Sequence, residues 1–237
     1  MRIGLWNIDH AELHDSGTRL AEKYHDVFRH LDQQRCDVYV VTEANAAMQL
    51  TGCQSQFSEE SPFQKKGRCY KSPNRYHQVA IYSRLPISKV AVTEPVNGLL
   101  CKIAWQGEPL FVYGNVITIK DQWKPDSKKG YSHRLDEQLE MFRRLATKRF
   151  IVCGDFNLRL GWAQRKNAFQ RVEQVVLEHG WFWPTKMQTD TVQHVIHSLQ
   201  LNISVTIDSS VKDERLSDHP FVLIDVAADS PPPGRQI

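Results

Sequence analysis

The sequence predicts an α/β domain built as a layered sandwich. Many short apolar runs are rich in β-branched and aromatic residues, which is typical of strands, and a few stretches carry apolar residues at helical spacing. Many strands with few covering helices favour a layered fold. The 237 residues suit one large domain, and no repeat or Gly/Ser-rich linker divides them.

The first unit is predicted to be a strand, a helix and a second strand, over residues 2–43. The runs "RIGLWNI" and "CDVYVVTE" have strand composition. Between them, apolar side chains recur at i, i+4, i+7, i+8 and i+11, which is one face of an amphipathic helix. These side chains are Leu20, Tyr24, Val27, Phe28 and Leu31.

The middle of the chain is predicted to be a loop followed by strands. Residues 51–76 are polar without a clear period, so we expect an irregular loop there, at the rim of an active site. The runs "HQVAIYS", "KVAVTEP", "LLCKIAW" and "LFVYGNVIT" follow, separated by turn signals. They predict consecutive antiparallel strands.

The last part mixes helices and strands. The spacing of apolar residues predicts helices over 133–148 and 163–179, on either side of the strand "RFIVCGDF". The runs "TVQHVIHS", "ISVTIDS" and "HPFVLIDV" predict the final strands. We therefore predict a single domain over 1–228 and a flexible Pro-rich tail over 229–237.

Composition argues against several classes of protein. No apolar run approaches the roughly 20 residues of a membrane helix, and the N-terminus lacks the pattern of a signal peptide. We expect a monomeric cytoplasmic protein with no membrane partner. The five cysteines form no CxxC pair, which argues against a disulfide framework and a cysteine zinc site. Buried reduced thiols are expected at Cys36, Cys101 and Cys153.

Charge is uneven along the chain. The net charge is +3, but residues 120–171 hold 13 Lys or Arg and 6 Asp or Glu. This local excess suits an anionic partner such as a phosphate backbone, and a solvated helix face is the other interpretation. Trp123, Tyr131 and Trp162 lie in or near this stretch. They are either stacking surfaces for bases or ordinary rim and core aromatics.

Four predicted strands end in polar groups. A cap or an Asx turn would explain each of them alone. Together they are a set of carboxylates, amides and one imidazole, and strand ends at one edge of a sheet can converge. The set is Asn7, Asp9, Glu43, Asp155, Asn157, Asp218 and His219.

This set has the composition of a metal-assisted phosphate site. Glu43, Asp9 and Asp218 offer hard oxygen ligands suited to Mg²⁺ or Mn²⁺. Asp155 can orient or deprotonate a water. The two asparagine amides can hold phosphoryl oxygens, and the imidazole can bond a non-bridging oxygen, which stabilises developing charge.

The motifs "WNID", "TEAN", "VAIYSRLPI", "CGDFN" and "LSDHPFVLIDV" together resemble a known superfamily in order and approximate spacing. This is the endonuclease/exonuclease/phosphatase superfamily. It includes exonuclease III-like apurinic endonucleases, pancreatic-type deoxyribonucleases, inositol polyphosphate 5-phosphatases and neutral sphingomyelinases. The resemblance runs from Arg2 to about Val226. It implies a four-layer α-β-β-α sandwich with two mixed β-sheets, a divalent metal and phosphoester hydrolysis.

The resemblance also implies roles for single residues. Glu43 matches the metal-binding glutamate. Asn7 and Asp9 match the "N-x-D" of the apurinic endonucleases, where the aspartate lies near the metal. Asp155 matches the water-activating aspartate and Asn157 its phosphate-binding neighbour. The Asp-His pair of the family's last motif matches Asp218 and His219 in "SDHP".

Two departures from the family pattern stand out. Gln193 occupies the place of an aspartate that orients the final histidine. A glutamine carbonyl can orient the ring but stabilises its charge less, so Gln193→Asp is expected to preserve or raise turnover. No His or Tyr follows "VYGNV", where Asn115 is a candidate to face the substrate. Arg159 and Lys166 are candidates to contact a second phosphate.

The leading hypothesis is therefore a metal-dependent phosphodiesterase with a phosphate-containing substrate, most simply DNA or RNA. One alternative is a small-molecule or lipid phosphatase of the same superfamily, although the polar 51–76 stretch argues against lipid. Another is a binding module with little catalysis, because of Gln193.

Overall fold

The computed structural model describes residues 1–9, 19–60, 64–65, 68–69, 76–91, 93, 97–119, 130–214 and 216–227. The tail predicted over 229–237 and the aromatic Trp123 lie outside these residues. None of the described helices is both long and apolar enough to cross a bilayer.

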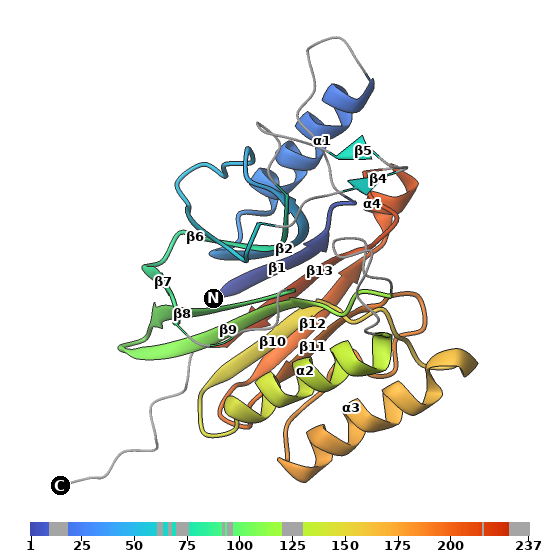
Figure 1. The fold of residues 1–237 in the computed structure, drawn as a ribbon. Helices are drawn as coiled ribbons and strands as arrows, with labels where there is room; N and C mark the ends of the chain where they lie inside the picture. Colours follow the sequence, from blue (N-terminus) through green and yellow to red (C-terminus); the bar gives the residue numbers. More distant parts are fainter. Residues whose placement is uncertain are drawn as a thin grey trace, which may run out of the picture.

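The first sheet has six strands in the order β12-β13-β1-β2-β6-β3 (Figure 1). The β1–β2 pair is parallel and the other pairs are antiparallel. The strands are β1 (Arg2–Asn7), β2 (Val38–Asn45), β3 (Gln54–Phe57), β6 (Tyr76–Ser83), β12 (Ile203–Asp208) and β13 (Phe221–Val226).

The second sheet has five strands in the order β11-β10-β9-β8-β7. Only its β9–β10 pair is parallel, so both sheets are mixed. The strands are β7 (Ile87–Lys89), β8 (Gly98–Trp105), β9 (Glu108–Val116), β10 (Phe150–Asp155) and β11 (Gln193–His197). A separate ribbon pairs β4 (Gln64–Lys65) with β5 (Arg68–Cys69).

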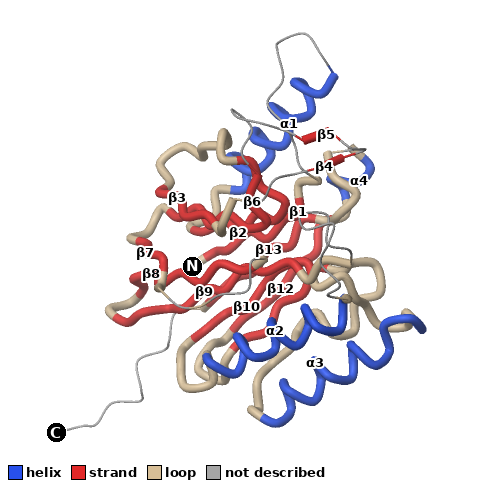
Figure 2. The backbone as a smooth tube through the Cα atoms, in the orientation of Figure 1, coloured by secondary structure: helices blue, strands red, loops and turns tan. Residues whose placement is uncertain are grey.

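The helices cover the two outer faces, and the strands lie between them (Figure 2). Beside the first sheet lie α1 (Arg19–Gln34) and α4 (Ser210–Asp213). Beside the second lie α2 (Tyr131–Arg144) and α3 (Lys166–Glu178), the latter preceded by the 3₁₀ turn η1 (Ala163–Arg165).

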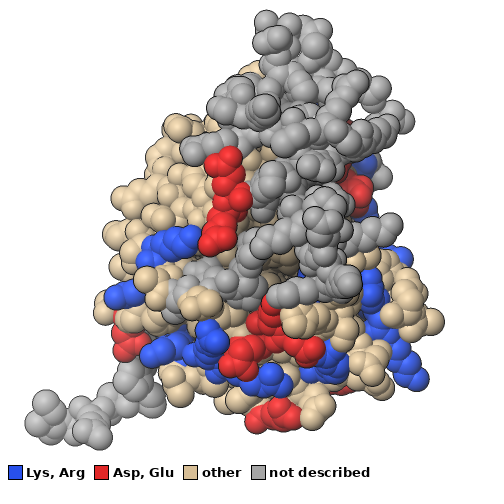
Figure 3. Space-filling view, in the orientation of Figure 1, with Lys and Arg blue, Asp and Glu red and all other residues tan. Residues whose placement is uncertain are grey.

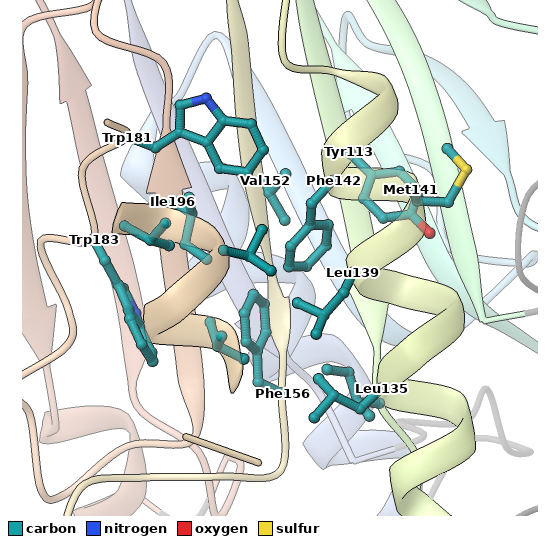
Figure 4. Close-up of a cluster of buried hydrophobic side chains, with 14 of the residues drawn as sticks. Tyr113, Leu135, Leu139, Met141, Phe142, Val152, Phe156, Trp181, Trp183 and Ile196 are labelled. Atoms are coloured by element: carbon teal, nitrogen blue, oxygen red, sulfur yellow. The ribbon is translucent and has the colours of Figure 1, made fainter. Parts of the chain in front are cut away.

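Three apolar clusters fill the spaces between these layers. The outer cluster of the first sheet joins α1 to the face of β1 and β2 that carries Trp6 and Tyr39. The inner cluster joins the two sheets through alternate residues such as Ile3 and Leu5. The third cluster packs α2 and α3 on the second sheet (Figure 4). The predicted four-layer α-β-β-α sandwich with two mixed sheets is confirmed.

Three predicted elements differ from the structure. Part of the 51–76 loop is strand, since β3 pairs with β6. The strand expected over 89–95 is β7, at Ile87–Lys89. The consecutive antiparallel series is broken, because β6 belongs to the first sheet and β7 to the second. A short turn such as "RLP" serves a hairpin and a crossover equally well, so the sequence could not separate them.

The cysteine prediction is confirmed. Cys36, Cys101 and Cys153 are free and buried. Cys53 is also free and is partly exposed.

The buried ring of His194 forms hydrogen bonds to two other segments of the chain beside the second sheet. The Trp183 indole donates to Nδ1 of His194 over 3.2 Å, and the Thr185 hydroxyl lies 3.1 Å from the same nitrogen. Because an indole only donates, Nδ1 is the acceptor and the proton sits on Nε2. Nε2 then donates to the Leu158 carbonyl over 2.9 Å. Burial lowers the pKa of His194 to about 4, so the neutral ring is the structural form.

This arrangement predicts a specific acid sensitivity. The pKa of His194 falls from its ordinary 6.5 to about 4 on folding, so between these values the unfolded chain binds a proton that the folded chain does not. The free energy of unfolding should drop by about 3 kcal/mol through this group as pH falls from 6.5 to 4. Urea melts at several pH values should show a shallower decline for His194→Gln. Equal declines would contradict the prediction.

Candidate active site

The two sheets meet through polar side chains at the ends of β1 and β10. Ile3 and Leu5 point into the space between the sheets, as do Ile151 and Cys153. Side chains alternate along a strand, so the next inward positions are Asn7 and Asp155. Their side chains are in contact, since the Asn7 Nδ2 donates to the Asp155 Oδ2 over 3.0 Å. Each strand therefore replaces its last inward apolar residue with a polar one, and the two partners meet across the sandwich.

The same two side chains also shape the turns that follow. The Asn7 Oδ1 accepts from the Asp9 N–H at 2.9 Å, and the Asp155 Oδ1 accepts from the Asn157 N–H at 2.8 Å. Asp9 and Asn157 both have left-handed backbones, with φ of 47° and 49°. Asp and Asn tolerate this region better than other residues with a Cβ. The expected Asx turns and the predicted site thus involve the same residues.

Glu43 reaches this place through an irregularity in β2. Its φ is 53°, and the pairing of β2 with β6 passes from Thr42 to Ala44 without it. Val41 and Ala44 pack in the same outer cluster although they are three residues apart, so the alternation shifts at Glu43. Left-handed backbone at a residue of this kind is costly and is concentrated at functional sites.

The carboxylates at this edge influence one another. Desolvation, followed by the charge of Asp155, raises the pKa of Glu43 to about 8, and Asp9 and Asp218 add to the effect. Burial raises the pKa of Asp155 as well, and Asp218 adds to this shift. His219 and the hydrogen bonds from Asn7 and Asn157 oppose the shift at Asp155. The site therefore concentrates carboxylates. Among the described side chains, the Lys23 Nζ lies 3.4 Å from the Asp9 Oδ2, and the His219 ring lies near Asp155 and Asp218.

The loop that carries Asp218 and His219 is fastened to the end of β1. The Ser217 hydroxyl donates to the Asn7 carbonyl over 2.6 Å and accepts from the His219 N–H at 3.1 Å. The Trp6 indole donates to the His219 carbonyl over 3.1 Å. Sequence analysis missed Ser217 and Trp6, although a serine two residues before a histidine is a signal for a hydroxyl turn. The His219 Nε2 lies 3.2 Å from the Asp218 Oδ1.

Gln193 holds the same loop from the other sheet. It lies opposite Asp155 in the β10–β11 ladder. With its amide oriented to satisfy both atoms, its oxygen accepts from the Asn7 N–H at 2.9 Å and its nitrogen donates to the Pro220 carbonyl. In the register of β1 and β13, Asn7 and Pro220 are the positions two steps beyond the last pair, Leu5 and Val222. The amide therefore bridges these strands where they separate.

Three predicted substrate contacts lie apart from this centre. Asn115 is buried, and alternation puts it on the helix side of β9 with Tyr113. A Cβ on Gly154 would stand only 2.4 Å from its Oδ1. Neither atom of its amide has a hydrogen-bond partner among the described residues. Arg159 and Lys166 lie beyond the end of β10, and Arg159 stacks on the Trp162 ring at 4.5 Å.

The basic stretch is electrically mixed where the structure describes it. Figure 3 shows Lys and Arg side chains among Asp and Glu side chains on the face near α2 and α3. Within the stretch Arg171 pairs with Asp136 and Arg144 with Glu140, and beyond its end Lys186 pairs with Glu173. Among the residues with described side chains, Lys166 has no ion-pair partner in this stretch. In the described part of the stretch, 130–171, cations therefore lie among acids rather than on one broad basic face.

The donor set at the site suits a hard cation that keeps most of its waters. No three His, Cys, Asp or Glu side chains of the described chain are grouped so as to hold a metal ion. Mg²⁺ needs only one or two protein carboxylates, and Glu43 lies beside Asn7 and further carboxylates. A divalent cation would also relieve the repulsion that raises the pKa of Glu43.

Solved structures share this fold at low sequence identity. A protein of the endonuclease/exonuclease/phosphatase family from Beutenbergia cavernae matches with a TM-score of 0.69 and 15% identity, over 95% of this chain and 70% of its own. The 3′ phosphatase NExo from Neisseria, solved with a product DNA hairpin, matches at 0.65 and 17% over 96% and 100%. An AP endonuclease from Archaeoglobus fulgidus matches at 0.60 and 15% over 96% and 100%.

Sequence comparison gives a family but no individual relative. No curated protein sequence matches the chain. The model of the Endonuclease/Exonuclease/phosphatase family matches residues 4–219, which include Asn7, Asp9, Glu43, Asp155, Asn157, Asp218 and His219. The chain belongs to the endonuclease/exonuclease/phosphatase family.

Proposed function

We propose that this protein is a divalent-metal-dependent phosphodiesterase that hydrolyses nucleic acid. One observation carries the proposal. Asp155 is buried, accepts a hydrogen bond from Asn7 of the opposite sheet, and lies within electrostatic range of Glu43, Asp218 and His219. A purely structural carboxylate is usually paired with a permanent cation, whereas the ionisable neighbours of Asp155 are an imidazole and further acids. Such an arrangement suits a base that works beside a metal and a phosphate.

The residues divide the work by chemical type. Glu43, with Asp9 or Asp218, would hold Mg²⁺ or Mn²⁺, which supplies polarisation of the phosphoryl group when bound. Asp155 would take a proton from the attacking water, and its raised pKa brings it closer to the range of an effective base. Asn7 holds the Asp155 Oδ2, which fixes the direction of the carboxylate.

The remaining groups would stabilise charge on the phosphate. The fastened loop presents the His219 ring, which can donate to a non-bridging oxygen. Asn157 lies two residues beyond Asp155 and can donate to another oxygen. Asn115 is not included in this set, because alternation puts its buried amide on the helix side of β9 while Asp155 points between the sheets.

Nucleic acid is favoured as the substrate over a small phosphate ester. The Neisseria protein was solved with product DNA, and the Archaeoglobus protein is an AP endonuclease. Arg159 and Lys166 follow the end of β10 and offer cations for a neighbouring phosphate. A small-molecule or lipid phosphatase is the alternative, and a weakly active binding module is a second one.

The first test is Asp155→Asn. Asparagine keeps the acceptor for the Asn157 N–H but cannot take a proton, so kcat on single-stranded or double-stranded DNA with Mg²⁺ should fall by about 10²- to 10⁴-fold. An aryl phosphodiester should respond in the same way. The exposed Asp190→Asn is the matched control and should retain activity. Undiminished turnover in folded Asp155→Asn would refute the proposed base.

The second test concerns the metal without turnover. Mg²⁺ should raise Tm by several degrees, because a ligand at about 100 times its Kd stabilises by about 2.7 kcal/mol and each kcal/mol shifts Tm by about 2–4 °C in a chain of this size. Glu43→Gln should remove most of the rise. Glu178→Gln, an exposed glutamate on α3, should not. An equal rise in all three proteins would place the metal elsewhere.

The third test concerns Gln193. A carboxylate can accept from the Asn7 N–H but cannot donate to the Pro220 carbonyl. Gln193→Asp and the isosteric Gln193→Glu should therefore lower the free energy of unfolding by about 1–3 kcal/mol and reduce kcat. This reverses the expectation drawn from the family pattern. Exposed Gln188→Glu is the control. Higher turnover with unchanged stability in Gln193→Asp would restore the earlier expectation.

A further inference from the structure

A pocket lies beyond the end of β10, beside the first turns of α3. Its volume is about 600 Å³, which is within the range of sites for small organic groups. One wall is the loop after Asn157, the second is the side of α3, and the third is the turn at Lys186 and Met187. The lining that matters for its chemistry is Arg159, Leu160, Trp162, Lys166, Phe169 and Met187.

The pocket follows the candidate active site along the chain. Arg159 is four residues from Asp155, which limits their Cα separation to about 14 Å. His194 joins two of the walls, because its ring bonds the Leu158 carbonyl on one side and Trp183 and Thr185 on the other. Its neighbour Gln193 lies opposite Asp155. A nucleic-acid strand with one phosphate at Asp155 can therefore reach the pocket within a few nucleotides.

The lining combines aromatic and apolar surface with cations. Trp162 is only partly covered, and the Arg159 guanidinium stacks on its ring at 4.5 Å. Met187 is 68% exposed, so its apolar surface is open to a ligand. The cation of Lys186 is paired with Glu173, so Arg159 and Lys166 are the cations left for a ligand. A planar group that carries a negative charge beside it fits these features.

We propose that this pocket binds a nucleobase of the substrate strand, next to the phosphate that is hydrolysed. The inference rests on the proposed function and adds a subsite to it. Trp162 and the Arg159 guanidinium offer the flat surface on which a base stacks, and Lys166 contacts the phosphate that follows. An acyl chain would gain nothing from two cations within the pocket, and a bare phosphate would gain nothing from Met187 and Phe169.

The test is binding without turnover. Fluorescence anisotropy in EDTA should compare a labelled single-stranded oligonucleotide with an abasic strand of the same length. The wild-type chain should bind the base-bearing strand more tightly. Trp162→Ala should weaken that binding by about 5- to 100-fold, as expected for the loss of one stacked base, and should leave the abasic strand unaffected. Trp162→Phe should keep most of the difference.

Two control variants separate binding of the base from binding of the phosphate. Lys166→Ala should weaken the binding of the base-bearing and the abasic strand alike. It should also reduce the slope of log affinity against log salt concentration by about one phosphate contact. Lys148→Ala removes an exposed cation just before the opposite end of β10 and should change neither. A base preference that survives Trp162→Ala would overturn the pocket assignment.

The outcome is distinguishable from failure of the proposed function. Hydrolysis of an aryl phosphodiester by the wild-type chain does not require a base. If that hydrolysis occurs while Trp162→Ala keeps the base preference, the pocket proposal alone is wrong. If neither DNA nor the aryl ester is hydrolysed with Mg²⁺ or Mn²⁺, the proposed phosphodiesterase itself is wrong.

Discussion

The hydrogen bond between Asn7 and Asp155 is the constraint around which the site is arranged. It joins two strands from different sheets, 148 positions apart in the sequence, at the point where the inner apolar layer ends. Its two side chains also close the turns at Asp9 and Asn157. A change in the packing angle of the two sheets would therefore disturb the position of the proposed base and of both turns at once.

The backbone and the charges of the site lower the free energy of unfolding, and hydrogen bonds around the site offset this loss. Three of the five described non-glycine residues with positive φ are Asp9, Glu43 and Asn157. Each such backbone costs on the order of 1–3 kcal/mol. Carboxylates that raise one another's pKa add an electrostatic cost. The offsetting contacts are ordinary ones: two Asx turns, the hydroxyl of Ser217, the Trp6 indole and the Gln193 amide.

Much of the fold was predictable because its strands are apolar runs with clear ends. The strand at β10 and the helical faces on α1 and α2 follow directly from spacing. The placement of β6 in the first sheet and β7 in the second was not predictable, since it depends on which partner strand each one pairs with and not on its own residues. The short strand β3 is mostly polar, and its pairing with β6 and the packing of Phe57 on the outer cluster are not visible in its own residues.

The main residues of the site could also be predicted from the sequence, but the contacts that hold them could not all be predicted. Polar residues at the ends of buried strands are visible in a sequence. Strand alternation then brings Asn7 and Asp155 together without further information. The hydrogen bonds of Gln193 could not be predicted, because its partners are backbone atoms of Asn7 and Pro220, and a sequence does not show which backbone groups lack a ladder partner.

The pairing of β1 with β13 has a consequence for folding. These two strands are far apart in the sequence but are neighbours in the first sheet, and the Met1 nitrogen donates to the Val226 carbonyl at 2.9 Å. The loop that carries His219 lies just before β13 and is fastened to β1. The acid cluster therefore cannot assemble until β1 and β13 have paired. A partly folded chain in which these two strands are still apart would lack the complete site rather than hold a weakened form of it.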